Sequence, residues 1–108
     1  MNTVTFFYST APDQSTARKI AESLVANGAA ACVNLISGMT SVYRWDGKIE
    51  IAEEVVMIVK STADARDDVR AIISSLHPYS TPAIAAIEIK EPLSSPEFCG
   101  WVKNSCGR

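Results

Sequence analysis

The sequence predicts an α+β fold whose elements follow the order strand, helix, strand, strand, helix, strand, with a short helix at the end. Two observations carry this prediction. Apolar residues recur with a period of two in some segments and with helical spacing in others. Asp46-Gly47 is a strong signal for a two-residue hairpin turn between two β-rich segments. At 108 residues the chain has room for one domain, residues 1–108.

The first strand and the first helix follow from the N-terminal residues. Val4, Phe6 and Tyr8 alternate with the residues between them, which is typical of a strand. The segment Thr10-Ala11-Pro12-Asp13 then offers a capping hydroxyl on Thr10, a proline in the first turn and an acid three residues after the cap. A helix is expected from here to Asn27-Gly28. Its expected apolar face consists of Ala17, Ile20, Ala21, Leu24 and Val25.

A single long β-hairpin is expected between Ala30 and Lys60. Its first arm, Ala30 to Trp45, contains Gly38 as a predicted bulge where the strand bends. Its second arm, Lys48 to Lys60, includes the run Val55 to Val59, which is apolar on both faces and predicts burial on both sides. At about 3.3 Å per residue the arms reach about 50 Å and about 40 Å, whereas a compact chain of this size has a radius of gyration of about 13 Å. The arms must therefore project beyond the body.

Projecting arms leave sheet edges and aromatic side chains exposed. Val42, Tyr43 and Trp45 stand near the hairpin tip, and interfaces are enriched in aromatic residues. Proteins normally pair or cover such edges and patches. We therefore expect a symmetric homo-oligomer. The alternative is that Gly38 folds the hairpin back over its own sheet.

The remaining elements complete the predicted order. Ser61-Thr62-Ala63-Asp64 is expected to cap a second helix, which His77-Pro78 ends. Ala83 to Lys90 alternates as a fourth strand, and Ser95-Pro96 begins the tail helix. The tail helix is expected to direct Phe98, Trp101 and Val102 inward. This order is the ferredoxin-like, or split βαβ, arrangement, with a long hairpin between its second and third strands.

The composition argues against several classes of function. The 12 acidic and 10 basic residues are interspersed and give a formal net charge of −2, so we expect no nucleic-acid partner. No apolar run approaches the roughly 20 residues that span a bilayer, and no targeting signal is evident, so we expect a cytoplasmic protein without a membrane partner. Cys32, Cys99 and Cys106 lack CxxC spacing, which favours reduced thiols.

His77 is the only histidine of the chain and a candidate metal ligand. It stands before Pro78 and Tyr79 at the end of the second helix, where it could bind a metal, carry a proton or simply cap the last helical carbonyls. Copper would require further imidazole, thiolate or carboxylate ligands, and none lies nearby in the sequence. Any site must therefore be assembled through space.

A second candidate is a ligand cleft that uses Lys60, Tyr79 and Trp45. Lys60 precedes a helix N-terminus, where it could help to hold an anion or could simply extend into solvent. Trp45 could stack on a ligand, although a subunit contact is the favoured interpretation. Glu50, Glu53 and Glu54 are interpreted as a solvated strand face. No motif of nucleophilic, phosphate-binding or zinc-dependent catalysis occurs, so we expect no enzyme.

A set of segments along most of the chain forms a specific combination. These segments are Thr10 to Asp13, Ala30 to Ile36, Gly38 with Thr40-Ser41, Tyr43 to Ile49, Glu54 with Met57 and Lys60, His77 to Tyr79 with Thr81-Pro82, and Trp101. In this order they resemble the CutA family of divalent-cation-tolerance proteins. The resemblance implies a ferredoxin-like protomer, a homotrimer closed by the hairpins, a layout similar to the PII signal proteins and an association with tolerance of copper and other divalent metals.

The resemblance also implies where a copper ion would bind. The ligands proposed in bacterial members are a cysteine at the end of the first strand, the histidine of the His-Pro-Tyr loop and a glutamate just after the Thr-Pro. In this sequence Ser9 and Ala83 occupy the first and third positions, and only His77 remains. A hydroxyl and a methyl group replace a thiolate and a carboxylate, so any copper binding is expected to be weak.

Two functions are therefore expected. The first is a homotrimeric metal-tolerance protein with weak copper binding at His77. The second is a PII-like signalling module that binds a small anionic ligand or a partner protein in clefts between subunits.

Overall fold

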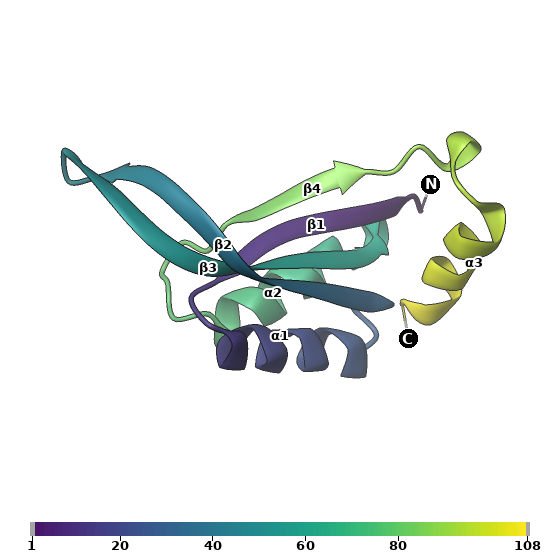
Figure 1. Ribbon diagram of the computed structural model, residues 1–108. Coiled ribbons are helices and arrows are strands. Elements are labelled where there is room, and N and C mark those ends of the chain that lie inside the picture. The colour runs from purple at the N-terminus through teal and green to yellow at the C-terminus, as the bar shows by residue number, and fades with distance from the viewer. Residues whose placement is uncertain (1, 108) are drawn as a thin grey trace.

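Four strands form one antiparallel sheet in the part of the chain that the computed structural model describes, residues 2–107, and α1 and α2 lie on one face of it (Figure 1). The predicted order of elements is confirmed, and the fold is ferredoxin-like. The elements are β1 (Val4–Ala11), α1 (Gln14–Ala26), β2 (Cys32–Trp45), β3 (Lys48–Thr62), η1 (Ala63–Ala65), α2 (Arg66–Leu76), β4 (Ile84–Glu88), η2 (Glu91–Leu93) and α3 (Pro96–Ser105).

The sheet has the order β2-β3-β1-β4, so β2 and β4 are its edges. In the ladder, Phe7 of β1 lies opposite Val59 of β3 on one side and Ala86 of β4 on the other. The two central strands are therefore hydrogen-bonded on both sides, while each edge strand keeps one open row of backbone groups. No helix among residues 2–107 is long and apolar enough to cross a membrane.

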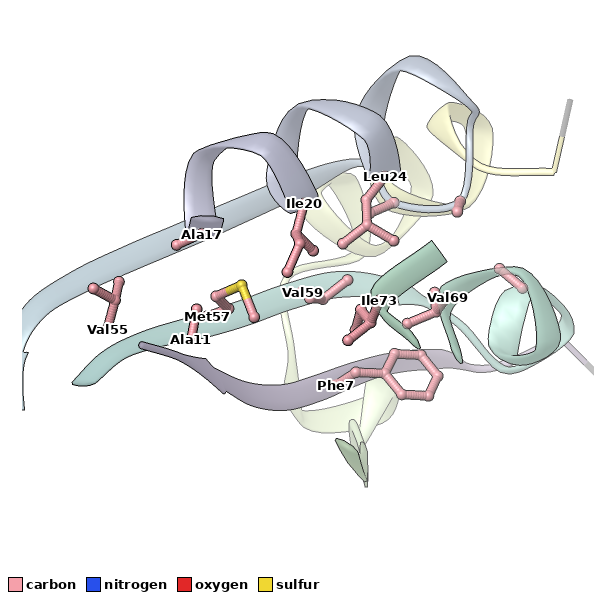
Figure 2. Close-up of a cluster of buried hydrophobic side chains, with 13 residues drawn as sticks. Phe7, Ala11, Ala17, Ile20, Leu24, Val55, Met57, Val59, Val69 and Ile73 are labelled. Atoms are coloured by element: carbon pink, nitrogen blue, oxygen red, sulfur yellow. The ribbon is translucent and has the colours of Figure 1, made fainter. Parts of the chain in front are cut away.

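The main core lies between the sheet and the pair α1 and α2 (Figure 2). Alternate residues of β3 point to this side, and Met57 and Val59 are fully buried there. The helical spacing expected for the first helix is confirmed at Ala17, Ile20 and Leu24, which are also fully buried. Val25 was expected on the same face but is 46% exposed, because it lies at the margin of the apolar stripe.

The hairpin of β2 and β3 projects beyond the helices (Figure 1), as its length predicted, and the molecule measures 45 × 27 × 22 Å. The turn residues Asp46 and Gly47 have φ values of +52° and +77°, which a type I′ turn requires. The predicted bulge is confirmed, because the register shifts between Ile36 and Met39 and Gly38 has a φ of +83°. The bend leaves the hairpin extended rather than folded over its own sheet.

Both predicted helix starts were wrong in detail. Asp13, not Thr10, caps α1, and its carboxylate accepts a hydrogen bond of 2.7 Å from the backbone N–H of Thr16. Similarly, β3 continues to Thr62, and the Ser61 hydroxyl donates to the carbonyl of Ala29 instead of capping a helix. These hydroxyl residues belong to paired strands, so the sheet ladder extends through positions where the sequence suggested caps.

Two further predictions needed correction, the direction of Trp101 and the length of the fourth strand. Trp101 is 50% exposed, whereas Cys99 and Val102 of α3 are buried against Val4. Trp101 precedes Val102 by one residue, so it lies about 100° away around the helix. The fourth strand is shorter than predicted, and Ile84 packs on the main core.

Candidate functional site

His77 is buried where the α2–β4 loop meets the end of β1, with 8% of its surface exposed. Its Nε2 atom lies 2.7 Å from the carbonyl oxygen of Thr10, and its Nδ1 atom lies 3.2 Å from the backbone nitrogen of Tyr79. A carbonyl oxygen can only accept and a backbone N–H can only donate, so Nε2 carries the proton and Nδ1 accepts. Both ring nitrogens are therefore engaged within the chain, and the imidazole ties the loop to β1.

The three positions that the resemblance assigns to copper lie close together. The Ser9 hydroxyl, which is fully buried, donates a hydrogen bond of 2.6 Å to the carbonyl of Ala83, and His77 bonds to the residue after Ser9. The donor atoms, however, are a hydroxyl already engaged with a carbonyl, an imidazole with no free nitrogen, and a methyl group in place of a carboxylate. These residues do not fit a copper site in this conformation. Within residues 2–107, no cluster of three or more His, Cys, Asp or Glu side chains is placed to hold a metal ion.

A groove of about 720 Å³ opens between the hairpin and the α2–β4 loop. Strand register explains how the hairpin side chains reach it. Tyr43 of β2 lies directly opposite Glu50 of β3, and the alternate residue Glu54 shares their face. Tyr79 from the loop closes the other side of this groove.

The groove is aromatic and acidic. Glu54 accepts hydrogen bonds from the hydroxyls of Ser41, at 2.7 Å, and Thr10, at 3.3 Å. Partial burial raises the pKa of the Tyr79 phenol, and the nearby Glu54 carboxylate raises it further. The phenol therefore stays protonated at neutral pH. Among the residues described, those that line the groove include two carboxylates and no lysine, arginine or histidine.

The side chains predicted to share one ligand cleft are divided by the structure. Trp45 and Tyr79 line the groove, but the Lys60 ammonium lies at the α3 end of the sheet, 6.0 Å from the ring centroid of Phe6 and 5.7 Å from that of Phe98. The register explains the separation, because Trp45 pairs at the hairpin tip while Lys60 pairs with Phe6 near the opposite end of β3.

Glu54 belongs to the groove although its sequence context did not predict a site there. The interpretation of Glu50, Glu53 and Glu54 as one solvated face was wrong, because consecutive strand residues point to opposite sides. Glu54 is half-buried and hydrogen-bonded in the groove, while Glu53 lies opposite Thr40 on the other side of the hairpin. The period-two alternation of Glu50, Ala52 and Glu54 was the signal that could have separated them.

The fold and this groove define a ferredoxin-like protein with an extended β2–β3 hairpin. The family model described as CutA1 divalent ion tolerance protein matches residues 5–105. The chain is 41% identical over 97 residues to the divalent-cation tolerance protein CutA of Archaeoglobus fulgidus, covering 90% of this chain and 92% of that protein. It is 38% identical over 98 residues to the protein of the same description from Thermus thermophilus, covering 91% and 93%.

A solved structure supports the same assignment. CutA from Xylella fastidiosa superposes with a TM-score of 0.92 at 33% sequence identity, over 96% of this chain and 98% of that one. This chain therefore belongs to the CutA1 family of divalent ion tolerance proteins, as the motifs in its sequence indicated.

Proposed function

We propose that this chain acts in divalent-cation tolerance as a homotrimer without enzymatic activity. Membership of the CutA1 family supports the role in tolerance. Support for the assembly comes from one observation above all, which is the large apolar surface that the chain leaves uncovered on its sheet and hairpin.

The sheet face opposite α1 and α2 contributes the first part of this surface. Ile36 and Ile87 are each 51% exposed, and the register places both on the same face as the half-buried Val56 and Ile58. Helix α3 covers only one end of this face, where Cys99 and Val102 pack with Val4, and Phe98 lies against Phe6. An apolar face of this kind would be stabilised by contact with a second copy.

The hairpin contributes the second part. Val42 and Ile51 lie opposite each other and are 64% and 70% exposed, and Trp45 at the tip is 69% exposed. Both β2 and β4 also have an unpaired edge. A cyclic assembly in which each copy offers its hairpin to the next covers the hairpins of all copies at once, and three copies are what the resemblance to the CutA and PII-like proteins implies.

A growth assay tests the role. A host that lacks its own CutA1-family protein is challenged with copper while it expresses this chain, and we expect growth to be restored relative to the empty vector. A variant in which Ile51 is replaced by aspartate serves as the assembly-deficient comparison and should restore growth less. Equal growth with the chain and with the empty vector would contradict the proposed role.

Weak copper binding at His77 belongs to the same proposal and stays a prediction. It requires the imidazole to release either the Thr10 carbonyl or the Tyr79 amide. Copper titrations of the wild type and of His77→Ala separate the possibilities, with the double variant Ser9→Cys and Ala83→Glu as a control that restores a thiolate and a carboxylate. Identical isotherms for the wild type and His77→Ala would remove His77 from the proposal.

We also propose a cytosolic location, which the free thiols of Cys32, Cys99 and Cys106 support. The solved structure of CutA from Archaeoglobus fulgidus is described as periplasmic, so the opposite location has a precedent among relatives. Cell fractionation decides between them, and recovery of the chain with periplasmic markers would contradict a cytosolic location.

A further inference from the structure

We propose that Glu54 of one copy forms an ion pair with Lys60 of the next copy, so that each subunit contact joins the two ends of the open sheet face. This inference rests on the proposed homotrimer and names the residues that would fix how its copies meet. The groove beside Glu54 would then be occupied by a side chain of the next copy rather than by a free ligand.

Strand β3 presents opposite charges at the two ends of this face. Side chains alternate along a strand, so Glu54, Val56, Ile58 and Lys60 all point away from α1 and α2. Glu54 stands at the hairpin end and Lys60 at the end that α3 covers (Figure 1). The face therefore has an acidic end, an apolar centre and a basic end.

The carboxylate of Glu54 is anchored within the chain but not neutralised. It accepts hydrogen bonds from the hydroxyls of Ser41, at 2.7 Å, and Thr10, at 3.3 Å. Both donors are uncharged, and a carboxylate has about four lone-pair sites, so it can accept further bonds. Within residues 2–107, the side chains that line the groove include no lysine, arginine or histidine. A cation for Glu54 must therefore come from outside this groove.

The ammonium of Lys60 also lacks a carboxylate. It lies 6.0 Å from the ring centroid of Phe6 and 5.7 Å from that of Phe98, and its partner across the ladder to β2 is Cys32. Lys60 takes part in neither of the ion pairs that residues 2–107 form. The two rings attract the ammonium and support it on the open face, but they do not balance its charge.

The two charges cannot meet within one chain. Six residues of continuous strand separate Glu54 from Lys60, which corresponds to about 20 Å. When other copies cover the face, both groups lose water, and a buried charge without a partner is strongly destabilising. Contacts in a closed cyclic assembly join different patches of neighbouring copies. Pairing the acidic end of one copy with the basic end of the next satisfies both groups at every contact.

The basic residues of the hairpin are less suitable partners. Arg44 lies opposite Ile49, on the other face of the strand pair from Glu54. Lys48 shares the face of Glu54, but it stands at the tip with Asp46 and Glu50 each two residues away. Lys60 is therefore the favoured cation for Glu54.

Zero-length cross-linking with a water-soluble carbodiimide tests the contact directly. The reagent activates a carboxylate, an amine displaces it to form an amide, and the carbodiimide leaves as the urea after taking up the elements of water. Because about 20 Å separates the two groups within one chain, an amide between Glu54 and Lys60 must join two copies. We expect cross-linked dimers and trimers on denaturing gels, and the Glu54–Lys60 amide in tandem mass spectra of their peptides.

Three conservative variants identify the atoms. Glu54→Gln should abolish this cross-linked peptide. Glu53→Gln is the matched control, since it removes the same charge from the opposite face of β3, and it should leave the peptide in place. Lys60→Arg keeps the positive charge but offers no amine, so the peptide should disappear while native mass spectrometry shows the same assembly as the wild type.

Charge reversal tests the energetic part. Glu54→Lys and Lys60→Glu should each weaken association by at least about tenfold, and the double variant Glu54→Lys with Lys60→Glu should recover most of the loss. Glu53→Lys combined with Lys60→Glu is the control and should not recover. Sedimentation velocity over a dilution series measures these changes, with added guanidinium if the wild type does not dissociate.

The outcomes separate this inference from the proposed assembly. A trimer that gives no Glu54–Lys60 amide, that cross-links Glu54 to Lys48 instead, or that charge reversal in both positions does not restore would overturn the ion pair and leave the homotrimer standing. A monomeric wild type in native mass spectrometry would overturn both.

Discussion

Strand β3 runs through two regions of the molecule that differ in what covers them. In the body of the sheet, Val55, Met57 and Val59 are at most 5% exposed, because α1 and α2 pack over them (Figure 2). In the projecting part, Ile49 and Ile51 continue the same alternation but are 62% and 70% exposed. An alternating pattern therefore determines which residues share a face, whereas burial depends on what else packs there.

The two regions also differ in what is expected to stabilise them. The body encloses its own core, so its packing contributes to the folding of a single chain. The projecting hairpin gains little from its own chain, and its apolar residues become useful only when another molecule covers them. Substitutions in the two regions should therefore affect different measurements.

The largest effect is expected from Leu24→Ala in the body. Leu24 is fully buried in the main core, so its truncation should leave a cavity and lower the free energy of unfolding by about 2–5 kcal/mol. Urea denaturation followed by circular dichroism measures this change. A decrease in the free energy of unfolding of less than about 1 kcal/mol would contradict the tight packing of the main core around Leu24.

In the hairpin, Ile51→Asp should act on association. Covering an isoleucine side chain contributes about 1.5–3 kcal/mol, and a charge at the same position opposes burial. We expect light scattering to show a smaller particle at a given protein concentration, while the circular dichroism spectrum keeps its helical signal. The control is Ser74→Asp, which adds the same charge at an exposed position of α2. An unchanged particle size for Ile51→Asp would place the subunit contacts elsewhere.

The bend that divides the two regions can be tested with a pair of glycine substitutions. Gly38 has a φ of +83° and Gly100 does not have a positive φ, and an added Cβ would meet nothing within 4 Å at either position. Gly38→Ala should therefore destabilise the protein by about 1 kcal/mol through backbone strain. Gly100→Ala, within α3, should stabilise it by up to about 1 kcal/mol. Thermal unfolding compares them, and shifts of equal sign would contradict this account of the bend.

The smallest effect is expected from pH at the α3 end of the sheet. The Glu91 carboxylate accepts hydrogen bonds from the Lys103 ammonium, at 2.7 Å, and from the Val4 amide, at 2.8 Å. The hydrogen bond from Lys103 has the largest effect and lowers the pKa of Glu91 in the folded chain, and the hydrogen bond from Val4 lowers it further. Their contribution is therefore present above the unfolded-state pKa and is lost as the pH falls through the lower folded-state pKa. The protection factors of the α3 amides, which are corrected for the intrinsic pH dependence of exchange, should fall over that acidic range in the wild type.

The variant Glu91→Gln isolates this effect. It removes the titrating group and should slightly lower the protection factors of the α3 amides near neutral pH, with a smaller further decrease in acid. An acid response of the same size in the wild type and in Glu91→Gln would assign the response to another group.

The order of elements could be predicted because it depends on local signals. Apolar spacing defined the strands and helices, Asp46-Gly47 defined the turn, and Gly38 marked the bulge, and all of these are encoded within a few residues. The cap of α1 could not be assigned correctly from such signals. Thr10 remains in β1, and its hydroxyl bonds to Glu54, a residue 44 positions away.

The candidate site was predicted only in part for the same reason. Trp45 and Tyr79 were identified from their residue types, and both line the groove. The separation of Lys60 from them depends on strand register along the whole hairpin, which short sequence motifs do not specify. The engagement of both His77 nitrogens likewise depends on the approach of β1 to the α2–β4 loop.

The most direct test of the central claim is native mass spectrometry of the purified wild-type chain. If other copies cover the hairpin and the open sheet face, the dominant species should have about three times the chain mass of 11.6 kDa. A species of 11.6 kDa that persists at all concentrations would contradict the account, because the exposed apolar residues of the hairpin would then remain uncovered.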